Sequence, residues 1–323
     1  MKTNTHEKLF EKNLINEKQF NFLNLVKTSK LISVYYELQI ILYVGVLLFA
    51  SGIGILIYKN IGQIGHIVSL ILLFLANILS FIYVYKQAFS YSNSKVEAPT
   101  PYFDYVLLLA SLLLISVQGY LQFLFGFLNN NLELSSLFTA LIFFYLAYRY
   151  DNLGILSLAI TSFAAFWGLS ISPQKWYSAN FFSFENFHIV GIVFSISMAI
   201  LAFYLNKNEI KKHFTFTYLN FSSLIFNFSV LTGVFTSSNS WFYLILLALG
   251  CYYMVIFAKN VKSFLFLLYT FIFAYIGTTY ILYKIIESSG PQLFMLAYFY
   301  PIISCGGFIY FIIKYKNYFK EEQ

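Results

Sequence analysis

Charged residues are scarce in this chain of 323 residues, since only 10% are Asp, Glu, Lys or Arg. A soluble domain carries about 25%. Hydrophobic residues make up 59%, aromatic residues make up 22%, and the mean hydropathy is +0.72. This composition argues against a soluble globular protein and favours a chain whose solvent is lipid.

Phosphate-binding motifs are also lacking. Residues 50–68 read ASGIGILIYKNIGQIGHIV, but Gly52 and Gly54 are not followed by the third glycine of a dinucleotide fingerprint, because Ile stands three positions later. The Walker pattern fails as well, since Lys59 is followed by Asn60 instead of Ser or Thr. The sequence therefore predicts no nucleotide cofactor, and the stretch is better explained as the connection between two membrane spans.

Titratable and thiol groups inside the apolar segments are few. All 13 Asp and Glu residues fall in tails, loops or span ends, which argues against a proton-coupled antiporter built on buried carboxylates. Cys251 and Cys305 are expected to be buried thiols and not a disulfide. Glu185 and His188 form a single Glu-x-x-His pair without a second copy, so interfacial polar residues explain them better than a metal site. No catalytic residue, metal ligand or cofactor is predicted, and the sequence favours a protein that is not an enzyme.

Long apolar runs are what the sequence does contain. The run from Leu38 to Tyr58 has 21 residues without a charge, close to the roughly 20 residues that a helix needs to cross the hydrocarbon core. No segment alternates like a membrane β-strand, so we predict an all-α, polytopic transmembrane helix bundle of about ten spans. The predicted spans are 38–58, 64–85, 103–123, 134–148, 153–171, 187–205, 214–236, 239–258, 263–283 and 292–313, of which the fourth is the shortest.

The positions of the basic residues give an independent test of this count. With the N-terminus inside, 17 of the 20 Lys and Arg residues fall on the inner side, and only Lys59, Lys175 and Lys284 fall outside. Because basic residues gather in cytoplasmic loops, this split predicts that both termini are cytoplasmic. The net charge of +7 then reflects orientation and contact with anionic membrane lipids, and indicates no nucleic-acid partner.

Three parts of the chain are expected. Residues 1–36 are polar enough to form a short cytoplasmic helical hairpin, with one helix ending at Asn13 and a second starting from Asn16. Residues 37–314 form the transmembrane bundle, and residues 315–323 form a cytoplasmic tail. The hairpin is too small for a stable domain alone, so it is expected to dock on the membrane part or to bind a protein partner.

The stretches NLINEKQ, GIGILI and QGYLQFLFGF, in the order hairpin, first span and third span, carry a resemblance. From residue 8 to about residue 127 the chain resembles the bacterial multi-span membrane protein family catalogued as domain of unknown function 2157. Members usually carry a glycine where Asn13 stands, and an Asn-Trp-Asp type of turn where this chain has Lys59, Asn60 and Ile61. The resemblance implies a bacterial cytoplasmic (inner) membrane and supplies no activity.

Small residues in the first span suggest close helix packing. Ala50 and Gly54 have the small-xxx-small spacing that lets a neighbouring helix approach, and KNIGQIG, residues 59–65, is predicted to be the tight turn into the second span.

The polar residues expected inside the spans are amides and hydroxyls. They would either line a polar pathway or, as we favour, form hydrogen bonds between helices. Pro301 in the tenth span is expected to kink the helix, and broken helices frame binding sites in many transporters. The candidate pathway residues are Asn77, Gln118, Gln122, Asn220, Ser223, Asn227 and Pro301.

Arg149 is the only arginine of the chain and lies near Asp151 at the cytoplasmic end of the fourth span. A bidentate ion pair or a contact to lipid phosphate is one interpretation. An ordinary interfacial anchor flanked by Tyr148 and Tyr150 is the interpretation we favour.

Two classes of function remain. The first is a transporter-like or lipid-handling membrane protein, and the second is a non-catalytic membrane scaffold or sensor whose N-terminal hairpin binds a cytoplasmic partner. A polar cavity at the middle depth of the bundle would favour the first class, and a solid bundle would favour the second.

The charge split predicts the sidedness of two loops. A topology reporter fused at Lys212 should report the cytoplasm, and one fused at Lys175 should report the outside. A reversed signal at either position would contradict the ten-span arrangement.

Overall fold

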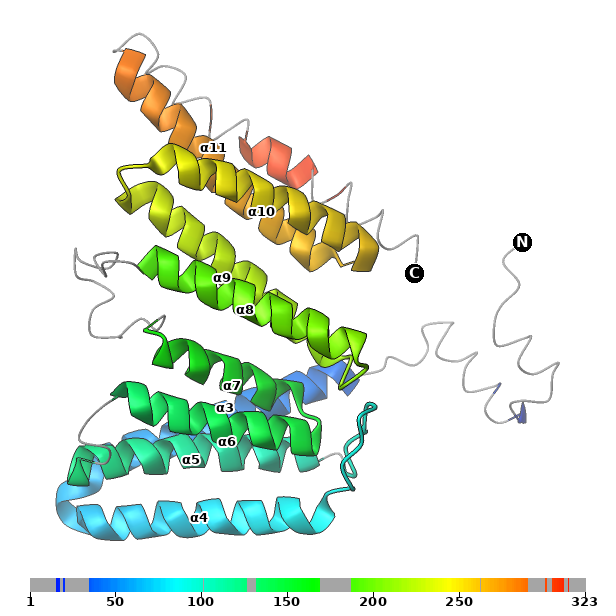
Figure 1. Ribbon diagram of the computed structural model, residues 1–323. Helices are drawn as coiled ribbons and strands as arrows, with labels where there is room; N and C mark the ends of the chain where they lie inside the picture. Colours follow the sequence, from blue (N-terminus) through cyan, green and yellow to red (C-terminus); the bar gives the residue numbers. More distant parts are fainter. Residues whose placement is uncertain are drawn as a thin grey trace. The chain divides into compact units, whose positions relative to one another are not determined.

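The computed structural model describes residues 16–17, 20, 35–100, 102–126, 132–168, 187–261, 263–289, 300, 304–310 and 313. Within these residues every regular element is a helix, as predicted (Figure 1). The nine labelled helices are α3 (Tyr35–Ile64), α4 (His66–Gln87), α5 (Phe103–Phe125), α6 (Leu132–Tyr150), α7 (Leu153–Phe166), α8 (Phe187–Lys207), α9 (Phe214–Thr236), α10 (Ser240–Val261) and α11 (Phe264–Ser289).

Seven helices in the described part of the chain are long and apolar enough to cross a membrane. They lie in α3, α4, α5, α8, α9, α10 and α11, each at the place of a predicted span. Pro301, Lys175, the C-terminal tail and most of the N-terminal hairpin and of the tenth span fall outside the described residues. The all-helical, membrane-compatible architecture is therefore confirmed, and the count of ten remains a prediction.

The predicted fourth and fifth spans differ from expectation in their lengths. The fourth, expected to be the shortest, is the 19-residue helix α6. The fifth is α7, whose 14 residues rise only about 21 Å, less than the roughly 30 Å of a hydrocarbon core. Neither is among the seven span-like helices. Asn152 sets the start of α7, because its side chain accepts a hydrogen bond from the Ile155 N–H and caps the first turn.

The predicted turn between the first two spans is wrong in its extent. Helix α3 continues through Lys59, Asn60 and Gly62 to Ile64, and a single residue, Gly65, separates it from α4. Gly65 has a φ of +78°, a conformation that glycine adopts without a Cβ penalty, so it is the residue that ends the helix. The glycines of residues 50–64 are helical and do not form a phosphate-binding loop.

The chain divides into two compact units, which are described separately. The first comprises residues 1–86 and 100–117, and the second comprises residues 87–99 and 118–323. In the first unit, Asn77 of α4 donates a hydrogen bond of 2.7 Å to the carbonyl of Ala110 in α5. Tyr43 of α3 packs edge-on against Tyr105 of α5.

In the described part of the first unit, no neighbouring helix contacts Gly54 in the packing site predicted at Ala50 and Gly54. Gly54 is exposed, Ala50 is half-buried, and no atom of the described residues lies within 4 Å of a Cβ built at Gly54. The contact expected from the small-xxx-small spacing is thus not among the contacts described, and a packing role for the two residues remains a prediction.

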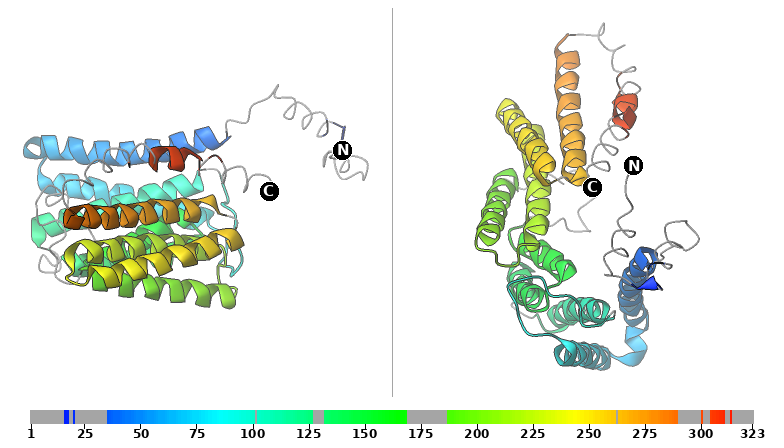
Figure 2. Two further views of the ribbon diagram at one scale, coloured as in Figure 1. Left: turned by 90° about the horizontal axis from the view of Figure 1, so that it is seen from above. Right: turned by 90° about the vertical axis from the view of Figure 1, so that its right-hand side faces the viewer.

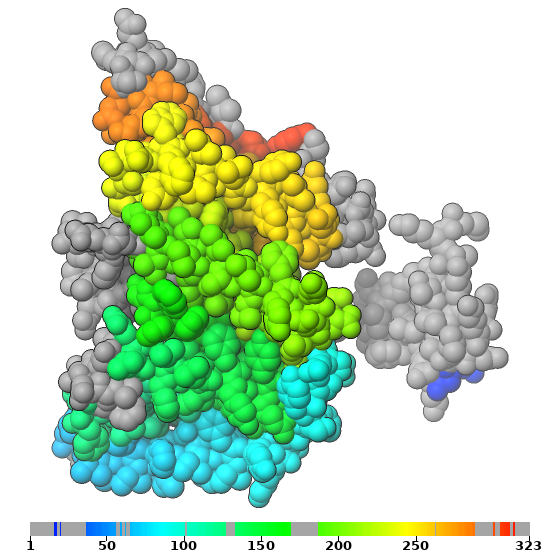
Figure 3. Space-filling model, viewed as in Figure 1, coloured from blue at the N-terminus to red at the C-terminus, as the bar shows by residue number. Residues whose placement is uncertain are grey.

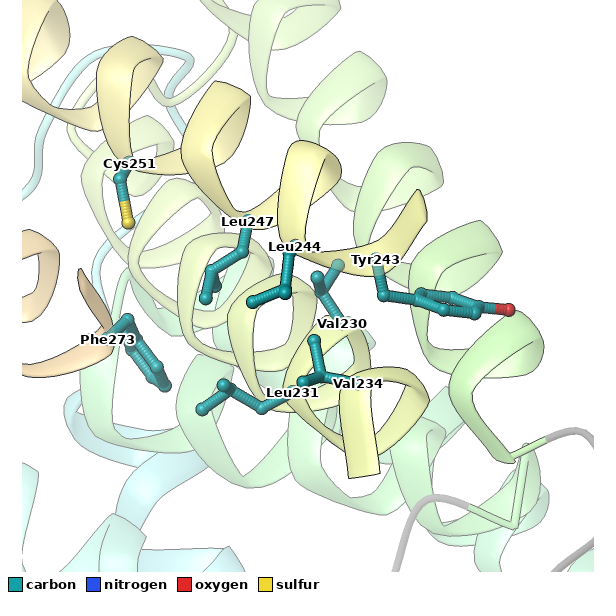
Figure 4. Packing of buried hydrophobic residues seen from close by; sticks show 8 residues of the cluster. All are labelled: Val230, Leu231, Val234, Tyr243, Leu244, Leu247, Cys251 and Phe273. Carbon is teal, nitrogen blue, oxygen red and sulfur yellow. The ribbon is translucent and has the colours of Figure 1, made fainter. Parts of the chain in front are cut away.

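In the second unit, α9 lies between α8 and α10 and packs on both (Figures 1 and 2). A hydrophobic cluster joins α9, α10 and α11 near one end (Figure 4). Gly233 of α9 lies against the ring of Tyr243, and a Cβ at this position would overlap the ring. The buried members of the cluster are Val230, Leu231, Val234, Tyr243, Leu244, Leu247, Cys251 and Phe273.

The described residues of the predicted tenth span pack against α11. Phe308 stacks on Phe271, and Ser304 pairs with the Tyr275 hydroxyl at 3.1 Å. The Tyr300 hydroxyl lies 2.7 Å from the hydroxyl of Thr279. Each step of four residues toward the C-terminus in α11 is matched by a step of four residues toward the N-terminus in the tenth span. This is the register of two antiparallel helices.

The contrast between two glycines gives a stability prediction. Gly233→Ala should destabilise the protein by about 1–3 kcal/mol, because the new methyl group would force the Tyr243 ring to move. Gly54→Ala should leave stability unchanged or raise it by up to about 1 kcal/mol through helix propensity. Thermal melting in detergent measures both, and a larger loss for Gly54→Ala would restore the close packing expected from the sequence.

Candidate functional site: a groove and a buried charge cluster

A groove lies in the second unit, between α8 and α10, with α9 as its floor. Its volume is about 290 Å³. Asn227 and Gly250 line it near the middles of α9 and α10, and Phe257 and Phe266 line it near the connection of α10 to α11. The groove therefore runs from the middle depth of the helices toward that end. In the space-filling view, α8 and α10 both reach the surface turned to the viewer (Figure 3). The groove reaches the middle depth of the helices, but its wall is mainly apolar, so it is not the polar cavity expected to favour the first class of function.

Most of the groove wall is apolar and aromatic. Three of its side chains, Ile196 of α8 and Leu249 and Tyr253 of α10, are also exposed on the outside of the bundle at 48%, 59% and 53%. An apolar molecule could therefore approach from the side of the helices. The apolar lining consists of Ile196, Ala199, Phe203, Leu219, Phe226, Leu249, Gly250, Tyr253, Met254, Phe257 and Phe266.

Four polar side chains interrupt this apolar lining. Ser195 of α8 and Ser222 of α9 are linked, because the Ser222 hydroxyl donates to the Ser195 carbonyl at 2.7 Å. Asn227 is fully buried, and its Nδ2 donates to the Ser223 carbonyl at 2.7 Å and to the Met254 sulfur at 3.0 Å. Its Oδ1 has no hydrogen-bond partner in the described part of the chain. We call Ser195, Ser222, Ser223 and Asn227 the polar stripe.

A separate cluster of charges is buried at one end of the second unit. Asp151 lies between α6 and α7, and Lys211 and His213 lie between α8 and α9. The Lys211 Nζ is 2.9 Å from the Asp151 Oδ2, and the His213 Nε2 bonds the Asp151 Oδ1. The side chains of Asp151 and Lys211 are each only 1% exposed, and that of His213 is 22% exposed. This charge cluster joins two helix connections that lie about sixty residues apart in the sequence.

The charge cluster also holds the segment between α4 and α5. The Val96 N–H donates to the Asp151 Oδ2 at 2.5 Å, and the Lys211 N–H donates to the Asn93 carbonyl at 2.9 Å. The Lys211 ammonium lies 5.3 Å from the centre of the Tyr91 ring. The α4–α5, α6–α7 and α8–α9 connections therefore meet at the Asp151 carboxylate and the Lys211 ammonium. Each of these two buried charges has the other as its partner.

The backbone adopts unusual conformations at this point. Asp151 and Lys211 have φ values of +56° and +46°, in the left-handed region that non-glycine residues rarely enter. Asp tolerates this conformation better than most residues, but Lys has no such preference. A strained backbone conformation persists only where the surrounding contacts hold it in place. The buried ion pair between Asp151 and Lys211 therefore explains why both residues keep a positive φ.

The anchor predicted around Arg149 has a different set of contacts. Arg149 Nη1 donates to the Phe89 carbonyl at 2.7 Å, and its guanidinium lies 5.3 Å from the Tyr150 ring centre. Tyr148 pairs its hydroxyl with that of Tyr218. The carboxylate of Asp151 binds Lys211 and His213, so the bidentate Arg149–Asp151 pair is not the arrangement found.

The predicted pathway residues do not converge on one site. Asn77 is in the first unit, where it bonds α5. Gln118 is buried and donates to the Ser135 carbonyl at 2.7 Å, while the Thr139 hydroxyl donates to its Oε1. Gln122 is buried one turn further along α5, and its Nε2 has no partner in the described part of the chain. Asn77 and Gln118 thus form hydrogen bonds to a neighbouring helix, and no such bond of the Gln122 Nε2 is described.

Among the pathway residues on α9, only some line the groove. Ser223 and Asn227 do, whereas Asn220 does not. Sequence reasoning missed Ser195, Ser222 and Gly250, together with Lys211 and His213. A usable signal was present only for the last two, because Lys211, Lys212 and His213 follow one another in a short loop opposite Asp151.

No family model, curated protein or solved structure matches the chain. No group of three or more His, Cys, Asp or Glu side chains that could hold a metal ion occurs among the described residues.

Removing one partner of the buried pair should be costly. Asp151→Ala leaves the Lys211 ammonium without its carboxylate, and we expect a loss of about 3–5 kcal/mol in stability. The double variant Asp151→Ala with Lys211→Met should recover most of that loss, because no unpaired charge stays buried, and Lys211→Met alone completes the set of variants. Melting in detergent, analysed as a double-mutant cycle, measures the coupling.

Glu287→Ala is the matched control, since it breaks the Lys284–Glu287 pair, whose side chains are 50% and 54% exposed. It should leave the melting temperature unchanged. Equal effects of Asp151→Ala and Glu287→Ala would show that the charge cluster carries no special weight.

Proposed function

We propose that this chain is a multi-pass integral membrane protein that binds small lipid-soluble molecules in the groove between α8 and α10, as a transporter-like or lipid-handling protein. The observation that carries the proposal is the groove itself, which reaches the middle depth of the helices and whose wall is mainly aromatic and aliphatic. Binding sites for small molecules have this composition, with a few polar groups that fix orientation.

The size of the groove sets the scale of the ligand. A dry cavity of roughly 150 Å³ holds one benzene, and small-molecule sites start near about 300 Å³. The groove, at about 290 Å³, fits a two-ring aromatic molecule or a short segment of an acyl chain. Five aromatic residues in the lining, Phe203, Phe226, Tyr253, Phe257 and Phe266, favour a flat ligand through ring contacts.

The location that goes with this function is a bacterial cytoplasmic membrane with both termini inside. The 17 to 3 distribution of basic residues supports the orientation. The type of membrane is inferred from the resemblance expected for residues 8 to about 127, for which no family model matches. The alternative function, a scaffold that binds a partner through residues 1–36, depends on a segment most of which lies outside the described residues.

The test is binding of naphthalene to the full-length protein in detergent. The unchanged protein should show saturable binding, and Ala199→Phe should abolish it, because a ring at this position fills the groove. Ile200→Phe is the matched control, since Ile200 is the next residue on α8, is 64% exposed and does not line the groove. No saturable binding, or equal binding by Ala199→Phe and the unchanged protein, would overturn the proposal.

A further inference from the structure

The serine hydroxyl groups of the polar stripe already donate their hydrogen bonds to backbone carbonyls. A carbonyl oxygen cannot donate a hydrogen bond, so a hydroxyl close to a carbonyl must be the donor. The Ser195 hydroxyl donates to the Ile192 carbonyl at 2.8 Å, and the Ser222 hydroxyl donates to the Ser195 carbonyl at 2.7 Å. The hydroxyl oxygens of Ser195 and Ser222 can therefore accept a hydrogen bond from a ligand but cannot donate one.

The other two members of the stripe show the same pattern. The Ser223 hydroxyl donates to the Asn220 carbonyl at 3.0 Å. The Asn227 amide nitrogen faces the Ser223 carbonyl and the Met254 sulfur, which are both acceptors. This fixes the orientation of the amide, because a flipped side chain would place two oxygens against each other. The Oδ1 is therefore the atom without a partner.

We infer that the groove selects lipid-soluble molecules that carry a hydrogen-bond donor, such as a hydroxyl group, over equally apolar molecules that can only accept. This inference rests on the proposed ligand site and names the class of ligand. A donor group on the ligand would meet the oxygens of the polar stripe, whereas an ether oxygen at the same place would meet only other acceptors. Buried polar atoms without partners are costly, so the difference should appear in affinity.

Asn227 has the most to gain from such a ligand. Its side chain is fully buried, and a Cβ built at Gly250 would lie 3.5 Å from its Oδ1. The same Cβ would lie 2.6 Å from an edge atom of the Phe226 ring. Gly250 and the ring of Phe226 therefore stand next to the oxygen, and a shift of this ring along the floor of the groove would open it to a ligand.

Tyr253 supplies the remaining hydroxyl of the lining, on the exposed side of α10. Its O–H would be able to donate to an acceptor ligand at the rim of the groove. The experiment must therefore separate this group from the polar stripe, and Tyr253→Phe does so without changing the ring.

The test compares 2-naphthol with 2-methoxynaphthalene, which has the same two rings but no donor. Binding of each to the full-length protein in detergent is measured by fluorescence titration, with Ala199→Phe as the blank for partition into the micelle. We expect 2-naphthol to bind about tenfold more tightly than its methyl ether. Tyr253→Phe should preserve this ratio, since the ratio is set by the polar stripe.

The outcomes separate the inference from the proposed function. Equal affinities for 2-naphthol and its ether, both blocked by Ala199→Phe, would overturn the donor selection and leave the ligand site standing. Tighter binding of the ether, lost in Tyr253→Phe, would show that Tyr253 and not the polar stripe sets selection. Binding of neither compound above the Ala199→Phe blank would overturn the ligand site itself.

Discussion

The burial of α9 is the constraint on which the second unit depends. This helix contacts α7, α8, α10 and α11, and half of its most apolar 18-residue stretch is buried. It has the largest buried share and the lowest mean hydropathy, 1.4, of the seven span-like helices in the described part of the chain. A helix surrounded by other helices can carry hydroxyls and amides that lipid would reject, so the polar residues concentrate where contact with lipid is least.

The groove follows from this arrangement. Because α8 and α10 both pack on α9, the space between them has α9 as its floor and inherits its polar side chains. Each hydroxyl bonds a carbonyl, which removes the cost of burying its proton. The lone pairs that remain are the source of any specificity. A fold that stabilises polar groups in this way leaves acceptors inside the bundle and few donors.

The sequence predicted the helices well because length and apolarity are local properties. The runs that became α4, α8 and α10 could be found within a few residues of their ends. The end of α3 could not, since KNIGQIG has the composition of a turn, whereas the chain makes its reversal at Gly65 alone. The end of α7 was also missed, because the apolar run continues past Phe166 while the described helix ends there.

The lining of the groove and the pairing inside the charge cluster could not be predicted for a different reason. Whether Ser223 faces a ligand site or a neighbouring helix depends on the rotation of α9, which the sequence of one helix does not specify. Asp151 and His213 are 62 residues apart, so their pairing depends on how two helix pairs pack. The sequence placed Asp151 at the end of a span beside Arg149, and the structure instead gives it Lys211 as a buried partner.

The environment from which a ligand arrives decides how much one hydrogen bond can select. In water, a donor loses bonds to solvent when it binds, so the net gain is small. The exposed sides of Ile196, Leu249 and Tyr253 point to arrival from lipid, where a hydroxyl deep in the hydrocarbon has few partners. A hydroxyl group that reaches the polar stripe from the hydrocarbon gains a hydrogen bond and loses few hydrogen bonds to its former surroundings. Selection for donors would then be stronger in a bilayer than in a hydrated detergent micelle, where water competes for the same hydroxyl.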